Sequence, residues 1–153
     1  MTIRLSPDPF DPQSELAAFI ERAQGAGAVV SFIGLARGQT RGGAAVERLF
    51  LDHHPRLTAR SMVDIADAAA DRFDISALHI VHRCGEVGPG EPIVFVAAAS
   101  AHRRAAFEAA DYLMDRLKTE APFWKKETGP DGERWIEPRP RDYEDVDRWR
   151  PAP

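Results

Sequence analysis

The sequence predicts an α+β domain with a largely antiparallel sheet and three main helices. The prediction rests on the order of its segments, in which each of three helical stretches is followed by a pair of apolar, strand-like stretches. Pairs of strands between helices favour antiparallel pairing over a doubly wound parallel sheet. The length of 153 residues suits one domain, because a chain of that size buries roughly 68–70% of its surface. We expect one domain over residues 1–139 and a loosely held tail, rich in proline and charge, over residues 140–153.

The first half of the chain begins with a helix and two strands. Asp11-Pro12 supplies an N-cap and a first-turn residue, and predicts a helix that ends before the Gly-Ala-Gly at 25–27. Strands are expected over residues 28–33 and 46–53, joined by a glycine-rich loop over residues 38–45.

The second half holds the two longer helices and four strands. Thr58 is expected to cap a helix running to about Phe73, and Ser100 a helix from about residue 101 to residue 120, which Pro122 ends. The strands are predicted over residues 77–84, 93–99, 123–127 and 133–137. The second of these strands has the composition of a strand buried on both faces, and the last two form a hairpin.

Composition and charge exclude several classes of protein. Twenty Lys and Arg against twenty-four Asp and Glu give a net charge of −4, which argues against coating of duplex nucleic acid. The longest apolar stretch, Ile93–Ala99, is far too short for a membrane span. The first residues lack the apolar core of a signal peptide, and the single cysteine, Cys84, favours a reducing compartment. We therefore expect a cytoplasmic protein.

The basic residues are unevenly divided between arginine and lysine. Seventeen are arginine, and the three lysines, Lys118, Lys125 and Lys126, are consecutive among the basic residues. A desolvated lysine can lose its proton and act as a base or nucleophile, which arginine cannot do. The segment 118–126 is therefore the first candidate for catalytic chemistry. Alternation along a strand places Lys125 and Lys126 on opposite faces, so at most one of them faces the same pocket as Lys118.

His102 and Arg103 fall at the start of the third predicted helix, where unpaired backbone amides favour an anion. The pattern indicates a phosphate or carboxylate site; the alternative is a solvated first turn with arginine paired to Glu108 or Asp111. Sixteen residues of helix separate His102 from Lys118, a distance of about 24 Å. Either these are two sites, or one subunit of a homodimer completes the site of the other.

Other candidates carry weaker signals. Arg37 follows a strand and precedes the glycine-rich loop, which favours either a ligand contact or an ordinary flexible loop. His79 and His82 point to opposite faces of their strand, so no metal site is expected. Cys84 is expected to be a small buried apolar residue.

Eight segments, in order over residues 27–139, carry a family resemblance. They are Phe32-Ile-Gly-Leu-Ala-Arg37, Leu51-Asp-His-His-Pro55, His82-Arg-Cys-Gly-Glu86 with Pro89-Gly-Glu91, Ser100-Ala-His-Arg103, Phe107-Glu-Ala, Met114-Asp-Arg-Leu-Lys118, Ala121-Pro-Phe-Trp-Lys-Lys-Glu127 and Arg134-Trp-Ile-Glu137. In these segments the chain resembles the catalytic, large subunit of molybdopterin synthase, whose fold is an α/β hammerhead.

The resemblance implies a transferase of molybdenum cofactor biosynthesis. Such an enzyme converts cyclic pyranopterin monophosphate into molybdopterin by installing two sulfurs as a dithiolene. The sulfur arrives as a thiocarboxylate on the C-terminal Gly-Gly of a small ubiquitin-like sulfur-carrier subunit. Two large subunits form a central homodimer within a heterotetramer, and neither a cofactor nor a resident metal is expected.

By position, the resemblance implies catalytic roles for Lys118 and Lys125, as proton donors and acceptors or as stabilisers of acyl transfer. The implied substrate contacts are Leu35, Ala36, Arg37, His102, Arg103, Lys126, Glu127 and Arg139. Among these, Arg37, His102 and Arg103 would hold the substrate phosphate. Two alternatives remain: a non-catalytic module that binds a ubiquitin-like tail, and a phosphate-dependent acyltransferase that binds a nucleotide or coenzyme A.

Overall fold

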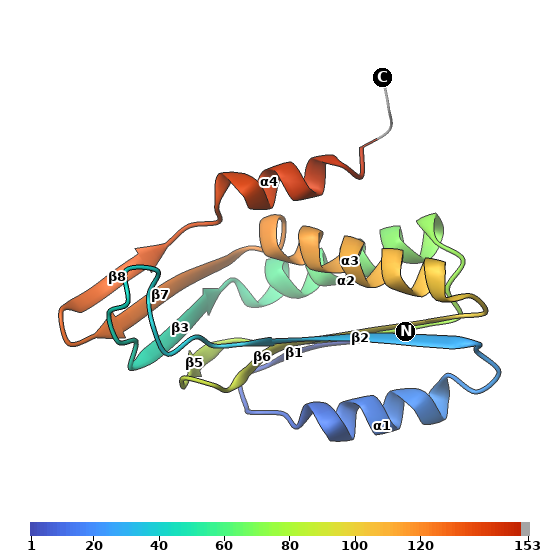
Figure 1. Ribbon diagram of the computed structural model, residues 1–153, viewed down its shortest axis with the longest axis horizontal. Helices are drawn as coiled ribbons and strands as arrows, with labels where there is room; N and C mark the ends of the chain where they lie inside the picture. The colour runs from blue at the N-terminus through green and yellow to red at the C-terminus, as the bar shows by residue number, and fades with distance from the viewer. Residues whose placement is uncertain (151–153) are drawn as a thin grey trace.

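The computed structural model describes residues 1–150, which form two four-stranded sheets and four helices (Figure 1). The first sheet contains, in order, β1 (Thr2–Ser6), β4 (Ala77–Arg83), β6 (Pro92–Ser100) and β2 (Ala28–Leu35). The second contains, in order, β5 (Gly85–Val87), β3 (Arg48–His53), β7 (Phe123–Gly129) and β8 (Gly132–Ile136). The helices are α1 (Pro12–Arg22), α2 (Pro55–Arg72), α3 (Arg103–Thr119) and α4 (Pro140–Asp147).

The predicted fold class is confirmed. Within residues 1–150, every strand pair is antiparallel except β1 with β4, which is parallel. The expected hairpin of β7 and β8 turns between Gly129 and Gly132. Gly132 has a φ of 108°, a left-handed conformation that side chains disfavour.

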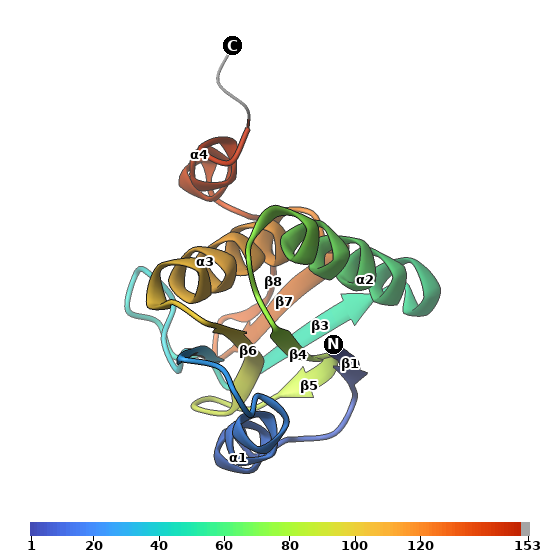
Figure 2. The same ribbon diagram turned by 90° about the vertical axis from the view of Figure 1, so that its right-hand side faces the viewer.

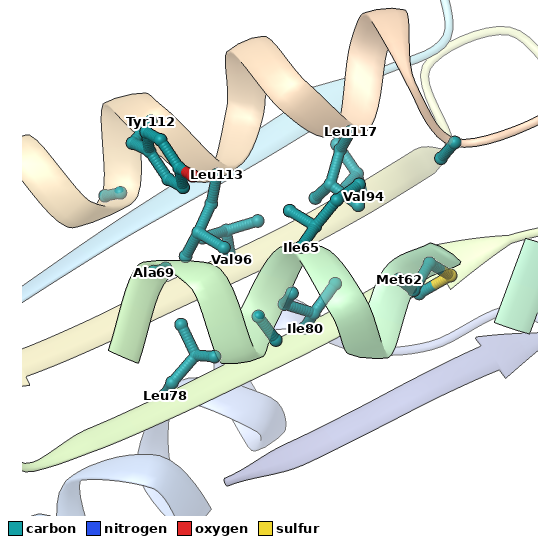
Figure 3. Close-up of a cluster of buried hydrophobic side chains, with 13 residues drawn as sticks. Met62, Ile65, Ala69, Leu78, Ile80, Val94, Val96, Tyr112, Leu113 and Leu117 are labelled. Atoms are coloured by element: carbon teal, nitrogen blue, oxygen red, sulfur yellow. The ribbon is translucent and has the colours of Figure 1, made fainter. Parts of the chain in front are cut away.

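The first sheet is the middle layer of the fold. Helices α2 and α3 cover one face and α1 covers the other (Figures 1 and 2). Along β6, Val96 faces α2 and α3 (Figure 3), whereas Phe95 faces Phe19 of α1. The prediction of a strand buried on both faces is therefore confirmed. Each large apolar side chain buried in this way contributes about 1.5–3 kcal/mol.

Both long helices begin at different residues from those predicted. Helix α2 starts at Pro55, where proline suits the first turn, and the Nδ1 atom of His54 accepts a hydrogen bond from the Leu57 amide at 3.3 Å. Thr58 is instead buried, and its hydroxyl donates to the Pro122 carbonyl at 2.8 Å. Ser100 ends β6, and the N-cap of α3 is His102.

Two short strands were not predicted. Strand β1 pairs in parallel with β4, about 75 residues further along the chain, and a local pattern carries no information on so distant a partner. Strand β5 occupies three residues of a segment rich in glycine, Gly85–Gly90, and pairs with β3.

The expectation of a loosely held tail is wrong for residues 140–150. Helix α4 lies along α3 on the side away from the first sheet (Figures 1 and 2). Beyond it, the indole Nε1 of Trp149 donates to Asp115 of α3 at 2.6 Å, and its ring packs edge-on against Phe73 and Tyr112. Charged residues dominate this segment, and their ion pairs with α3 add to the apolar packing of Trp149 in docking it.

No helix within the described residues has the length and apolar character needed to cross a membrane.

Candidate active site

Lys118 and Lys125 come together where the end of α3 meets the second sheet. Lys118 lies in the last turn of α3, where a cation is favoured by the helix dipole. Lys125 lies on β7 directly opposite Leu51 of β3. Directly opposed residues of an antiparallel pair share a face, and Leu51 is fully buried, so Lys125 points inward.

The surroundings of Lys125 favour its neutral form. Burial is the largest cause and lowers the pKa of Lys125, and the cations of Lys118 and Arg139 lower it further. The carboxylate of Asp142 acts in the opposite direction. A lysine with a lowered pKa holds a larger neutral fraction near neutral pH and can accept a proton.

Asp142 of α4 completes this cluster. It is 6% exposed, one carboxylate oxygen accepts a hydrogen bond from the Lys118 ammonium group, and the other accepts from the Arg139 amide at 2.7 Å. Burial alone would raise the pKa of Asp142, but the bonds from Lys118 and Arg139 outweigh it and the pKa is lowered. Sequence reasoning missed Asp142, although proline at 140 followed by an acid two residues later is a helix-start signal.

Lys126 and Glu127 occupy different faces of β7. Lys126 lies on the outer face, within 3.2 Å of Glu133 and beside the rings of Phe50 and Trp135. The prediction that Lys125 and Lys126 face opposite sides is therefore confirmed. Glu127 shares the inner face with Lys125 and pairs with Arg134 at 2.8 Å.

Leu35, Ala36 and Arg37 leave the end of β2. Ala36 is buried, whereas Leu35 and Arg37 are exposed. Arg37 and the next three residues line a shallow surface hollow. The glycine-rich loop that follows is closed by the Thr40 amide, which donates to the Ala44 carbonyl at 2.8 Å. The loop is thus a defined hairpin.

His102 and Arg103 lie at the opposite end of α3 from the lysines. Both are exposed, and within residues 1–150 neither side chain pairs with a carboxylate. The alternative pairing of an arginine there with Asp111 is not seen, because Asp111 contacts Arg148 at 2.8 Å. A single chain therefore leaves these two residues about 24 Å from Lys118.

His82 is a neighbour of Lys125 that sequence reasoning did not assign to the site. Its ring stacks on Phe123 at 4.0 Å, and its Nδ1 atom donates to the Arg83 carbonyl at 2.8 Å. Burial is the main cause that lowers the pKa of His82 to about 4, and the Lys125 charge adds to it. His82 is therefore neutral at physiological pH.

The remaining candidates are packed into the body of the fold. His79 faces α1, where its Nδ1 atom accepts from Arg22 at 2.8 Å and its Nε2 atom lies 2.9 Å from Glu15. The prediction of opposite faces for His79 and His82 is confirmed. Cys84 is buried as expected, and burial raises the pKa of its thiol.

Comparison with known proteins gives one consistent family. The sequence model of the MoaE protein family matches residues 5–120. A molybdopterin synthase catalytic subunit from Caulobacter vibrioides is 51% identical over 149 residues, which are 97% of each chain. The solved structure of a molybdopterin biosynthesis MoaE protein from Burkholderia ambifaria has 42% identity and a TM-score of 0.81, and the match covers 97% of each chain.

A more distant structure agrees in fold. It is a protein–protein complex of subunits 1 and 2 of molybdopterin-converting factor from Helicobacter pylori, with 21% identity and a TM-score of 0.75. The match covers 90% of this chain and 91% of that one. At this identity the likeness establishes the shared fold alone.

Proposed function

The chain belongs to the MoaE protein family, and on that premise we propose that it acts as the catalytic subunit of a molybdopterin synthase. The reaction transfers two sulfurs to cyclic pyranopterin monophosphate and forms the dithiolene of molybdopterin. Each sulfur comes from the C-terminal thiocarboxylate of a small ubiquitin-like sulfur-carrier subunit, whose C-terminus is released as a carboxylate.

The observation that carries the proposal is the pairing of a buried, inward-pointing Lys125 with Lys118. Sulfur transfer from an acyl carrier requires proton transfer and stabilisation of developing negative charge. A lysine with a lowered pKa suits the first task, and the positive charge of an ammonium group suits the second. We assign Lys125 to proton transfer and Lys118 to charge stabilisation, and both to catalysis.

The remaining assigned residues bind substrate. Arg37, His102 and Arg103 hold the phosphate, since their exposed positive or hydrogen-bonding groups lack an internal carboxylate partner within residues 1–150. Leu35, Ala36, Lys126, Glu127 and Arg139 complete the substrate contacts.

The assembly is a heterotetramer built on a central homodimer. The distance along α3 supports this proposal, because His102 and Arg103 reach a lysine pair only if it belongs to a second subunit. The small sulfur-carrier subunit docks at each end with its C-terminal Gly-Gly directed to the lysines. We place the enzyme in the cytoplasm, where a single buried cysteine remains reduced.

A single-turnover assay tests the function. The full chain is mixed with cyclic pyranopterin monophosphate and a thiocarboxylated carrier, with the same carrier ending in an ordinary carboxylate as control. Dithiolene product from the first mixture alone is expected. Binding of the carrier tail without product would contradict catalysis and support the non-catalytic binding module.

A further inference from the structure

Asp142 is the most deeply buried carboxylate in contact with the lysine pair, and the proposed function gives it no role. It lies on α4, outside the segments that carry the family resemblance. A buried carboxylate is costly unless it is paired and hydrogen-bonded. Asp142 meets both conditions, and its ionic partner is the proposed catalytic residue Lys118.

We propose that Asp142 is a positioning residue that fixes the Lys118 ammonium group and sets the charge balance of the Lys118–Lys125 pair. The inference rests on the proposed sulfur-transfer function, because it assigns a role within that reaction. Asp142 acts through Lys118 and does not itself touch the substrate.

The geometry supports a fixed carboxylate. One oxygen of Asp142 accepts from Lys118, and the other accepts from the Arg139 amide at 2.7 Å, so the carboxylate has a single orientation. Lys118 is long and half-exposed, with 45% of its side chain accessible, and it would otherwise sample several rotamers. Asp142 therefore removes the conformational freedom of a side chain that needs a defined position.

The far end of α4 is held independently of the lysines. Arg148 contacts Asp115 at 2.6 Å and Asp111 at 2.8 Å, and Trp149 donates to Asp115. These contacts hold the end of α4 against the middle of α3, while Asp142 holds its start against Lys118. Because α4 is fixed at both ends, the Asp142 carboxylate keeps its position beside Lys118.

Asp142 carries the only negative charge among the groups that face Lys125. These groups are the cation of Lys118 on α3, the cation of Arg139 before α4, the neutral ring of His82 on β4, and the carboxylate of Asp142 on α4. Asp142 is the one group in this set that favours the protonated form of Lys125. Removing its charge leaves two cations unopposed, so the pKa of Lys125 must fall further.

The sequence makes a direct test feasible, since the chain contains only three lysines. Protein labelled in its lysine side chains gives three NMR signals, which can be titrated separately. In Asp142→Asn, which is isosteric but uncharged, we expect the Lys125 midpoint to move down by about one pH unit or more. Asp142→Glu keeps the charge and should restore most of the wild-type midpoint. Asp145→Asn removes the charge of a half-exposed aspartate on the same helix, which pairs with Arg141 and not with a lysine, and is the matched control.

The same variants are compared by single turnover across pH. In Asp142→Asn the lysine-dependent limb of the pH profile should move down with the NMR midpoint, whereas Asp145→Asn should match wild type. Asp142→Ser is made in parallel, so that one variant failing to fold does not decide the outcome. Thermal unfolding identifies any variant that is merely unstable.

The inference would be overturned by an unchanged Lys125 midpoint in folded Asp142→Asn, or by an equal shift in Asp145→Asn. A lower rate with an unmoved pH profile would also contradict it and indicate a structural role. Failure of the proposed function looks different, because wild type would then form no product while the NMR midpoint still responded to Asp142.

Discussion

The two ends of α3 present positive charge in opposite ways. At its start, His102 and Arg103 are exposed, and within residues 1–150 neither meets a carboxylate. At its end, Lys118 contacts a buried carboxylate and lies in the field of Lys125. One helix thus carries the uncompensated cation of Arg103 at one end and a compensated cluster at the other.

This difference separates binding from chemistry. For an exposed cation without an internal partner, the free-energy cost of desolvation is small, and the cation can bind an anionic ligand. Lys125, buried beside the end of α3, has a lowered pKa, which is the property of an acid–base group, and Lys118 has a carboxylate partner that fixes its position. The contrast favours phosphate binding at the start of α3 and, at its end, proton transfer by Lys125 of β7 beside the fixed charge of Lys118.

The largest effect is expected from Lys125→Arg. This change replaces the titratable group near the end of α3 with a permanent charge like that of Arg103 at its start. Loss of a positioned acid–base group lowers rates about 10²–10⁴-fold. We expect a fall of that order in single-turnover product formation, and a fall also in Lys118→Arg. Arg141→Lys, on an exposed part of α4, is the control. Undiminished product in both lysine variants would show that charge alone suffices.

The next prediction tests the burial of His82, the neighbour of Lys125, through the pH dependence of the free energy of unfolding. The folded-state pKa of His82 is about 4, against about 6.5 in an unfolded chain. As pH falls from about 6.5 to about 4, the unfolded state takes up a proton that the folded state excludes. The free energy of unfolding should therefore fall, by about 3 kcal/mol from this group, and level off below pH 4.

Urea unfolding between pH 7.5 and 4 checks this dependence. His82→Gln should lose the part of the slope that His82 contributes, with the remainder due to His79, whose pKa is also lowered by burial, whereas His53→Gln on β3 should keep the wild-type slope. Parallel profiles for wild type and His82→Gln would contradict the burial argument.

The start of α3 is tested by Arg103→Ala. A hydrogen bond to a charged group contributes about 1.5–3 kcal/mol, so KM for the pterin substrate should rise roughly tenfold or more. The rate at saturating substrate should change less, because the lysines are untouched. Arg104→Ala, at the next position on the helix, should have a smaller effect on KM. A fall in kcat at constant KM would place Arg103 in the chemistry instead.

The last prediction tests whether Arg103 at the start of α3 in one subunit shares a site with Lys125, near the end of α3, in the other subunit. If they do, a mixed dimer of Lys125→Arg and Arg103→Ala contains one intact site and one doubly altered site. Random mixing then gives about a quarter of wild-type sites, although each variant alone is impaired. No recovery on mixing would place both ends in separate sites of one subunit.

Local patterns predicted much of the site and little of what surrounds it. The third helix and the opposite orientations of Lys125 and Lys126 follow from periodicity, which a short segment carries by itself, whereas the pairing of Lys125 with buried Leu51 decides which of the two points inward. The buried strand β6 follows from a continuous apolar run. The start of α2 was misplaced because Thr58 has the composition of a cap, yet its hydroxyl is used by Pro122.

The missed features depend on contacts between distant residues. Asp142 pairs with a lysine 24 residues earlier, and β1 pairs with a strand about 75 residues later. The charge-rich composition after Pro140 suggested a solvated tail, whereas Asp142 and Arg148 of this segment form ion pairs with residues of α3. A single sequence shows neither kind of partner.

The position of Asp142 in the chain has a consequence for how the enzyme matures. Both sheets are complete by Ile136, and the carboxylate follows on the last helix. During synthesis from the N-terminus, Lys118 and Lys125 emerge before the counter-charge that balances them. The docking of α4 is thus the final step in assembling the site, and a chain that stops short of it carries the two facing lysines without their counter-charge in an otherwise finished fold.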